Sequence, residues 1–400
     1  MAEKKKILIF SHALELGGAE KALLGLMESI DQSRYQVDLF LMRHEGALFQ
    51  YIPETINLLP EKPQYASLAV PIMDVFRKGQ ILVAYGRYRG KKKARKRVQE
   101  LGLPTDNDVG LQSSHLYTLP YMPQISQKEY DLAISFLTPH YFVAEKVKAK
   151  KKIAWIHTDY SKVAVDQETQ LAMWGKYDRI VSISPQVTDS FLAVFPSFRN
   201  KMIEIQNIYP MDYLNCKKNE FTALDEMPED GSTRLLSIGR FCTAKNFDNV
   251  PEICRYLLKE GLNVKWYLIG FGTDEDLIWN RIKECGMDEH VIVLGKKENP
   301  YPYIQACDLY VQPSRYEGKC VSVLEAQLFH KPVVITDYAT SASQLENGVD
   351  GMIVPLDNEK CAAGIAELLR DPVKMNSLIS NCRNRDYSNH SEVNKLYSLM

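Results

Sequence analysis

Short apolar runs alternate along the chain with segments whose apolar residues recur at helical spacing. The first run, Ile7–Phe10, is followed by the loop SHALELGG and then by residues 19–30, where the apolar positions fit one face of a helix. Four later runs of the first half end in polar or small residues: YQVDLFLM, DLAISFL, KKIAWIH and DRIVSIS. This alternation predicts βαβ units in a parallel sheet, with ligands gathering where the strands end.

The same rhythm restarts after a polar stretch without periodicity, residues 215–233. Six further runs follow, RLLSIGR, VKWYLIG, VIVLG, LYVQPS, KPVVIT and GMIVP, with helical patterns between most of them. We therefore predict an α/β protein with two Rossmann-like domains, residues 1–214 and 233–375, facing each other across a cleft. The remaining segment, residues 376–400, is helical in pattern, and we expect it to pack back on the first domain.

Residues 60–125 interrupt the βαβ rhythm and contain a dense basic run. Eight cations crowd eleven positions without an acid: Arg87, Arg89, Lys91, Lys92, Lys93, Arg95, Lys96 and Arg97. A solvated helix face is the ordinary explanation of such a run, but like charges at this density gain from a negative partner. Because the apolar residues Ile81, Leu82, Val83 and Tyr85 come just before, we expect attachment to an anionic membrane surface. RNA is the competing partner.

Size and composition support two globular domains and limit the partners. The chain has 400 residues, 45% hydrophobic and 25% charged, with a net charge of −1. A balanced charge argues against a protein devoted to nucleic acid, so we expect no nucleic-acid partner. No apolar run approaches the length that crosses a bilayer, and no signal-peptide core forms. We expect a cytoplasmic protein that associates peripherally with the inner face of the cell membrane.

Two loops could hold phosphate. Gly17 and Gly18 lie between the first strand and the first helix, where backbone N–H groups are accessible, although paired glycines at such a turn are often structural. In the second domain, SIGRFCTAKNFD places Arg240 and Lys245 just after a strand. Two fixed cations at a strand end suit a diphosphate, and a solvated surface pair is the alternative.

Two glutamates form an E-x7-E arrangement after the strand LYVQPS. Glu317 lies in the loop, Gly318 at the bend, and Glu325 inside the following helix. Both carboxylates can therefore point into one cleft. The amides of Val321 and Ser322, near the start of that helix, would add anion donors.

Acidic clusters elsewhere do not predict a metal site. The sequence TDEDL, with Asp274, Glu275 and Asp276, begins a helical pattern, where acids and a Thr cap are expected. Asp106 and Asp108 are typical turn residues. We expect neither a metal nor another cofactor.

Together, these motifs resemble a known family. GGAE near the N-terminus, WIHTDY in the middle, SIGRF with Lys245, and YEG followed by LEA look like the retaining, nucleotide-sugar-dependent glycosyltransferases of family 4, which have the GT-B fold. The similarity covers nearly the whole chain in the family's order. One departure concerns donor identity, because Lys319, Cys320 and Val321 follow Gly318 where many members have other residues.

The resemblance implies a role for each matching residue. Arg240 and Lys245 would bind the diphosphate, Glu325 the ribose hydroxyls, and Glu317 the hydroxyls of the donor sugar. Gly239, Val321 and Ser322 would line the same donor site. Gly18 would allow close approach of donor phosphate or acceptor, Gly17 and Glu20 would lie on the acceptor side, and His157 would lie near the donor sugar.

The resulting hypothesis is retaining transfer from a sugar nucleotide, with UDP-sugar preferred, to a hydroxyl of a glycan or lipid-linked acceptor. Such a reaction would suit cell-surface polysaccharide or glycolipid assembly. Catalytic roles would fall to Arg240, Lys245, Glu317 and His157. The alternative is a catalytically silent GT-B partner subunit that acts through an interaction or a membrane surface. An NAD-dependent oxidoreductase would need a dinucleotide fingerprint, which neither half contains.

Overall fold

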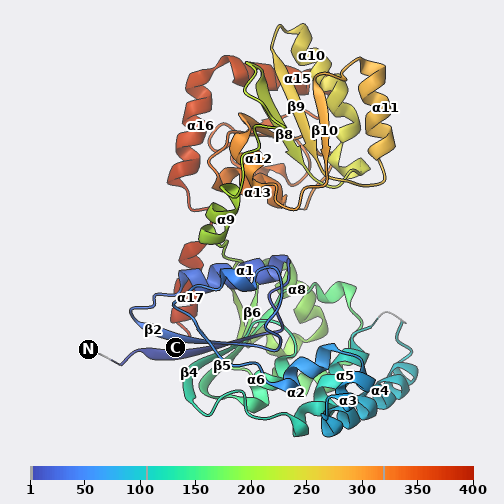
Figure 1. Ribbon diagram of the computed structural model, residues 1–400, viewed down its shortest axis with the longest axis vertical. Helices are drawn as coiled ribbons and strands as arrows, with labels where there is room; N and C mark the ends of the chain where they lie inside the picture. Colours follow the sequence, from blue (N-terminus) through green and yellow to red (C-terminus); the bar gives the residue numbers. More distant parts are fainter. Residues whose placement is uncertain (1–2, 105–106, 319) are drawn as a thin grey trace. The chain divides into compact units, whose positions relative to one another are not determined.

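The computed structural model describes residues 3–104, 107–318 and 320–400, which form two compact units (Figure 1). The first unit comprises the chain up to Met211 together with Asn389–Met400, and the second is Asp212–Ser388. The polar stretch 215–233 therefore lies inside the second unit. Of residues 376–400, the part from Asn389 onward belongs to the first unit.

The first unit is built on a parallel sheet of seven strands in the order β3-β2-β1-β4-β5-β6-β7. The strands are β1 (Lys5–Ser11), β2 (Tyr35–Leu41), β3 (Asn57–Leu58), β4 (Glu129–Ser135), β5 (Lys148–Ile156), β6 (Arg179–Ser182) and β7 (Met202–Glu204). The central strand β1 pairs Ile7 with Val37 on one side and with Leu132 on the other. The chain order reverses between β1 and β4, so the crevice for a ligand is expected at their carboxyl ends.

Helices cover this sheet and form an additional cluster at one edge of the unit (Figure 1). They are α1 (Gly18–Ser29), α2 (Pro63–Ala66), α3 (Ile72–Arg77), α4 (Ile81–Leu101), α5 (Val109–Thr118), α6 (His140–Lys146), α7 (Gln167–Trp174), α8 (Pro185–Val194) and α17 (Val393–Tyr397). The basic run is thus part of α4, a helix of 21 residues. The returning tail is fixed by α17, whose Tyr397 ring stacks on Tyr35 with centroids 4.6 Å apart.

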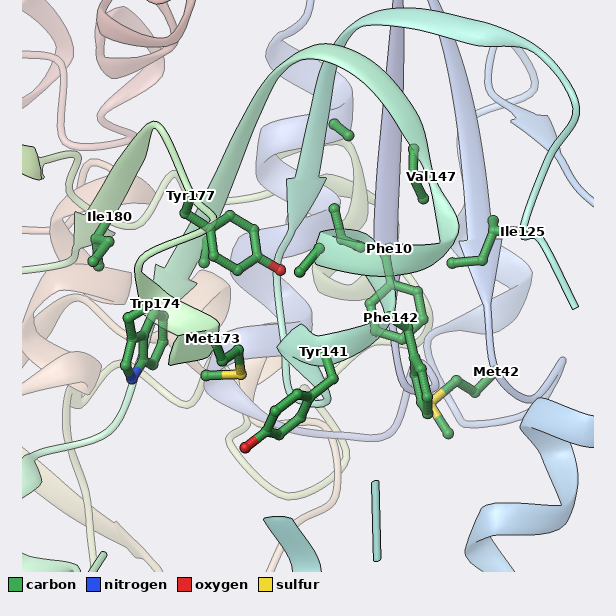
Figure 2. Packing of buried hydrophobic residues seen from close by; sticks show 14 of the residues in the cluster. Phe10, Met42, Ile125, Tyr141, Phe142, Val147, Met173, Trp174, Tyr177 and Ile180 are labelled. Atoms are coloured by element: carbon green, nitrogen blue, oxygen red, sulfur yellow. The ribbon is translucent and has the colours of Figure 1, made fainter. Parts of the chain in front are cut away.

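Aromatic side chains dominate the core between the sheet and α6 and α7 (Figure 2). Phe10 of β1 and Phe142 of α6 meet edge to face, with ring centroids 6.2 Å apart. Trp174 ends α7, and its ring lies 6.3 Å from that of Tyr177. Burial of these large apolar surfaces supplies the main driving force that holds α6 and α7 on the sheet.

The second unit has a parallel sheet of six strands in the order β10-β9-β8-β11-β12-β13. Each of the six apolar runs from the sequence forms one strand: β8 (Thr233–Ile238), β9 (Val264–Ile269), β10 (Val291–Gly295), β11 (Leu309–Gln312), β12 (Val333–Thr336) and β13 (Met352–Val354). The helices are α9 (Met211–Lys218), α10 (Val250–Lys259), α11 (Glu275–Cys285), α12 (Tyr301–Ala306), α13 (Val321–Leu328), α14 (Ser341–Gln344), α15 (Asn358–Arg370) and α16 (Pro372–Asn384). The predicted α/β class is confirmed in both units. Here the chain order reverses between β8 and β11.

Within the described ranges, no helix combines the length and the apolar character that crossing a bilayer requires.

Candidate functional site

The loops after β8 and β11 meet at the point where the strand order of the second unit reverses. The β8 loop carries Arg240, which is exposed, and Lys245, which ends a short 3₁₀ turn and is half-buried. The β11 loop carries Glu317, and the two loops are joined by the ion pair of Arg315 with Asp248, whose N···O distances are 2.9 and 2.7 Å. Topology thus brings together residues that lie about 70 positions apart.

Lys245 and Glu317 form an ion pair between these two loops. Nζ of Lys245 lies 2.5 Å from Oε1 of Glu317, and Ser314 Oγ donates to the same oxygen at 2.7 Å. The Cys320 sulfur lies 3.6 Å from the ammonium group. Burial lowers the pKa of Lys245, but Cys320 and Glu317 outweigh that effect and raise it above its usual value. Lys245 is therefore a permanent cation at neutral pH.

Gly239 makes room for the lysine. A Cβ at this position would lie 2.9 Å from Cε of Lys245, so the aliphatic part of that side chain crosses the glycine backbone. Because the ammonium group is held by Glu317, a larger residue at 239 would displace it from the carboxylate. This gives the predicted donor-site glycine a concrete local function.

Two glycines after β9 pack closely against the loop that follows β8, and the sequence reasoning did not single them out. Gly270 and Gly272 have φ of +155° and +158°, which side-chain-bearing residues rarely adopt. A Cβ on Gly270 would lie 1.8 Å from the Gly239 carbonyl oxygen, and one on Gly272 would lie 2.2 Å from that of Phe241. The G-F-G sequence directly after a buried strand was the available signal.

Helix α13 directs its N-terminus toward the end of β8. Ser322 Oγ donates to the Ile238 carbonyl at 3.2 Å, and Val321 is 53% exposed. Cys320 precedes the helix, and its N–H is bound by Gln344 Oε1 at 2.7 Å. The first N–H groups of a helix lack partners within it. That those of Val321 and Ser322 serve as anion donors therefore stays a prediction.

Glu325 is buried, at 8% exposure, inside α13. Tyr301 of α12 donates its hydroxyl to Oε1 of Glu325 at 2.9 Å, and Tyr213 packs edge-on against that tyrosine ring at 6.4 Å. The structure therefore links Glu325 to Tyr301, and Glu317 to Lys245. Tyr301 was missed, because a lone tyrosine at the start of a short helix has no distinctive sequence pattern.

In the first unit, the loop after β1 leads into α1, which starts at Gly18 with Gly17 as its N-cap. A Cβ on Gly18 would meet nothing within 4 Å, so packing does not require this glycine and its backbone is open to approach. A Cβ on Gly17 would fall 2.2 Å from a carboxylate oxygen of Glu20. The Glu20 side chain thus folds back over the start of its own helix, where a negative charge is favoured.

His157 lies just beyond β5 and lines a cavity of about 240 Å³ whose surface is mostly apolar. The other lining residues with polar groups are Asp108, Gln112, Thr138, His140, Trp155, Thr158 and Tyr160. Both ring nitrogens of His157 are shielded from solvent and have no hydrogen-bond partner among the described residues, as is also true of Trp155 Nε1 and Thr138 Oγ1. Burial lowers the pKa of His157 to about 4, so its imidazole is neutral at pH 7. Shielded polar groups without partners around a cavity suit a polar, uncharged ligand.

The acidic clusters lie at helix starts. Asp274 is the N-cap of α11, whose first turn contains Glu275 and Asp276. Asp108 is the N-cap of α5 and also faces the His157 cavity, while Asp106 and Lys319 lie outside the described residues. In the described part of the chain, no three His, Cys, Asp or Glu side chains are grouped to hold a metal ion.

The eight cations of α4 divide into two groups. Arg87 donates to the Ser67 and Val70 carbonyls, and Arg97 pairs with Asp166 and Glu168. These two half-buried arginines brace the helix against the rest of the unit, whereas the other six cations of the run are exposed.

Most of the second unit matches a known protein family. Residues 224–385 match the model of the glycosyl transferases group 1. The second unit is thus similar to the group 1 glycosyltransferases over almost its whole length. The matched range contains Arg240, Lys245, Glu317 and Glu325.

Two curated relatives are similar to part of the chain. A Campylobacter jejuni N-acetylgalactosaminyltransferase that acts on an undecaprenol diphosphate-linked saccharide is 30% identical over 139 residues, which cover 34% of this chain and 37% of the relative. An Escherichia coli UDP-Gal:α-D-GlcNAc-diphosphoundecaprenol α-1,3-galactosyltransferase is 21% identical over 252 residues, 62% of this chain and 63% of the relative. The chain thus spans about a third to two thirds of these relatives' lengths.

Solved structures extend the likeness beyond the group 1 glycosyltransferase domain. HepE of Anabaena in complex with UDP has a TM-score of 0.56 at 17% identity and is covered completely, with 99% of this chain aligned. TarM has a TM-score of 0.57 at 14% identity, with 100% of this chain and 99% of that chain covered. The whole chain therefore has the GT-B fold, as the motifs indicated.

Proposed function

We propose that this protein is a retaining hexosyltransferase that moves a sugar from a UDP-sugar to a hydroxyl of a glycan or lipid-linked acceptor. The Lys245–Glu317 pair carries the proposal, because it fixes a cation at the strand-order reversal of a group 1 glycosyltransferase domain. Uracil as the base is supported by the UDP bound in HepE, and a lipid-linked acceptor by the names of the C. jejuni and E. coli relatives.

In the proposed donor complex, fixed positive charges make the largest contribution to catalysis. Lys245 and Arg240 face the diphosphate, and the N–H groups at the start of α13 add to the positive field. As the bond from the sugar C1 to the phosphate oxygen breaks, negative charge develops on the leaving UDP. A cation already fixed in place stabilises that charge without reorganising, which is the largest single contribution in many enzymes.

The acceptor hydroxyl attacks C1 from the face that UDP leaves, and the new C1–O bond keeps the configuration of the donor. The hydroxyl proton passes to the departing phosphate oxygen, so the step needs no protein base and no metal. Glu325, held by Tyr301, accepts the ribose hydroxyls, and Glu317 contacts hydroxyls of the transferred sugar.

Neutral His157 and the cavity that it lines suit uncharged sugar hydroxyls. A lipid-linked acceptor would place the enzyme at the inner face of the cell membrane. The alternative, a catalytically silent GT-B subunit, is disfavoured because Arg240, Lys245, Glu317 and Glu325 are all present.

Slow donor hydrolysis tests the proposal without a known acceptor. The purified protein is incubated with a panel of UDP-, GDP- and ADP-sugars, and release of nucleoside diphosphate is measured. We expect release from at least one UDP-sugar and retention of configuration in the sugar released to an added alcohol acceptor. Tight UDP-sugar binding with no release, with or without added alcohols, would support the silent-subunit alternative, and inversion would refute the retaining mechanism.

A further inference from the structure

The outer face of α4 changes from apolar to basic along its length. Side chains spaced three or four apart share one side of a helix, which places Ile81, Tyr85, Tyr88, Lys92 and Arg95 together. The first three are large, apolar or aromatic, and 50–60% exposed, and the last two are exposed cations. One continuous surface thus begins apolar and ends positively charged.

The opposite face of α4 is buried against the rest of the first unit. Gly86 and Gly90 lie against α5 so closely that a Cβ on either would come within 2.7 Å of a backbone carbonyl of that helix. Val83, which the sequence grouped with the apolar residues of the membrane contact, is buried on this side together with Ala94. Close packing on α5 therefore fixes which residues of α4 face outward.

Helix α3 enlarges the apolar part of the surface. It precedes α4 and packs against it (Figure 1), and it exposes Met73 at 63% and Phe76 at 54%. Leu82, at 61%, adds a third large side chain next to the junction. Exposed apolar residues are ordinary when scattered, but a cluster of this kind on two neighbouring helices marks an interaction site.

The charges beside this apolar cluster are unbalanced. Lys91, Lys92, Lys93 and Arg95 have no acidic partner within the described residues, whereas Lys96 pairs with Glu100 at 3.4 Å. Arg89 lies between the two parts, with its guanidinium over the rings of Tyr85 and Tyr117 at 5.7 and 5.5 Å. Tyrosine and arginine combine apolar area with a polar end, as groups at a membrane boundary do.

We propose that the α3–α4 surface docks the protein on an anionic lipid bilayer. Met73, Phe76, Ile81 and Leu82 enter the headgroup and acyl-chain boundary, while Lys91, Lys92, Lys93 and Arg95 lie over the negative headgroups. An RNA partner would use the cations and the aromatic rings but not the aliphatic side chains of Met73, Ile81 and Leu82, so the combination favours a bilayer. The proposal goes beyond glycosyl transfer and does not depend on it.

Co-sedimentation with vesicles tests the surface in two matched pairs of variants. The basic variant changes Lys91, Lys92, Lys93 and Arg95 to Gln, and its control changes four exposed cations of the second unit: Lys259, Lys283, Lys360 and Arg383. The apolar variant changes Phe76, Ile81 and Leu82 to Gln, and its control changes three exposed apolar residues of the second unit: Leu277, Trp279 and Val373. Circular dichroism and thermal midpoints establish that all four remain folded.

Wild type and both controls should sediment with vesicles of phosphatidylglycerol and phosphatidylcholine, and much less with phosphatidylcholine alone. Since each cation near an anionic surface strengthens attachment about fivefold, the basic variant should bind at least about a hundredfold more weakly. The apolar variant should lose at least about tenfold. Wild-type sedimentation by either variant would overturn the proposal. So would single-stranded RNA binding that outcompetes the vesicles and is lost in the basic but not the apolar variant, because that pattern identifies a nucleic-acid site.

Discussion

The ammonium group of Lys245 lies 2.5 Å from Oε1 of Glu317, and the two residues come from loops that follow neighbouring strands, β8 and β11. The pairing matters because a lysine in an open loop would lose much of its directional effect to rotamer freedom and to water. Glu317 and the Gly239 backbone hold the Lys245 side chain, so its charge is in place before any diphosphate binds.

Glu325 and Tyr301 should act on nucleotide binding rather than on the chemical step. A carboxylate on the ribose hydroxyls contributes equally in ground and transition states, so Glu325→Ala should weaken UDP binding with little further loss of turnover at saturation. Tyr301→Phe removes one hydrogen bond to Glu325 and should weaken UDP binding by roughly three- to tenfold. Calorimetry with UDP measures both effects. Unchanged affinity in a folded Glu325→Ala variant would remove this residue from the ribose site.

Replacement of Gly270 tests how closely the loop after β9 packs on the loop after β8. Gly270→Ala combines a backbone conformation that alanine rarely adopts with a Cβ 1.8 Å from the Gly239 carbonyl oxygen. We expect a loss of unfolding free energy of about 3 kcal/mol or more. In the control, Gly348→Ala, φ is also positive at +78° but a Cβ would meet nothing within 4 Å, so the loss should be about 1 kcal/mol. Equal denaturation midpoints for the two variants would show that the collision is relieved at no cost.

Metal removal should leave transfer intact. In the proposed donor complex, the fixed cations and the start of α13 offset the charge of the diphosphate, and the acids near α11 lie at a helix N-terminus. Donor hydrolysis is measured in excess chelator and again after Mg²⁺ or Mn²⁺ is restored. Loss on chelation and recovery on metal addition would contradict the expectation and redirect attention to Asp274 and Asp276.

Burial of His157 predicts a stability change in mild acid. Its folded-state pKa is about 4 against an ordinary value of 6.5, so the unfolded chain takes up a proton over this interval that the folded chain refuses. Stability should therefore fall as pH decreases from about 6.5 to 4. His157→Gln should flatten this slope in urea titrations at several pH values, whereas His44→Gln, outside the cavity, should retain it. Identical slopes for His157→Gln and wild type would show that this histidine is freely protonated in the folded protein.

The sequence was sufficient for most strands because buried parallel strands read as uninterrupted apolar runs. All six strands of the second unit were located this way, as were β1, β2, β4, β5 and β6. The strands β3 and β7 escaped because they have two and three residues and no fully buried position. The pattern could not reveal them, since tertiary pairing at a sheet edge defines them.

The sequence placed the charged residues correctly on strand ends and on a helix, but it did not indicate their mutual contacts. Strand ends located Lys245 and Glu317, and the E-x7-E spacing located Glu325. That Glu325 is bound by Tyr301, and Glu317 by Ser314, depends on packing between segments far apart in sequence. Arg87 and Arg97 show the converse, because a charge run in sequence does not distinguish cations that brace the fold from cations that face solvent.

The rate at which Lys245→Ala releases UDP from a saturating UDP-sugar tests the central claim most directly. The claim predicts a loss of about a hundredfold or more relative to wild type, with a similar loss for Arg240→Ala and wild-type rates for Lys283→Ala, an exposed cation on α11. Thermal midpoints verify that each variant is folded. Wild-type turnover by Lys245→Ala would contradict the assignment of the β8 and β11 loops as the site where the leaving diphosphate is stabilised.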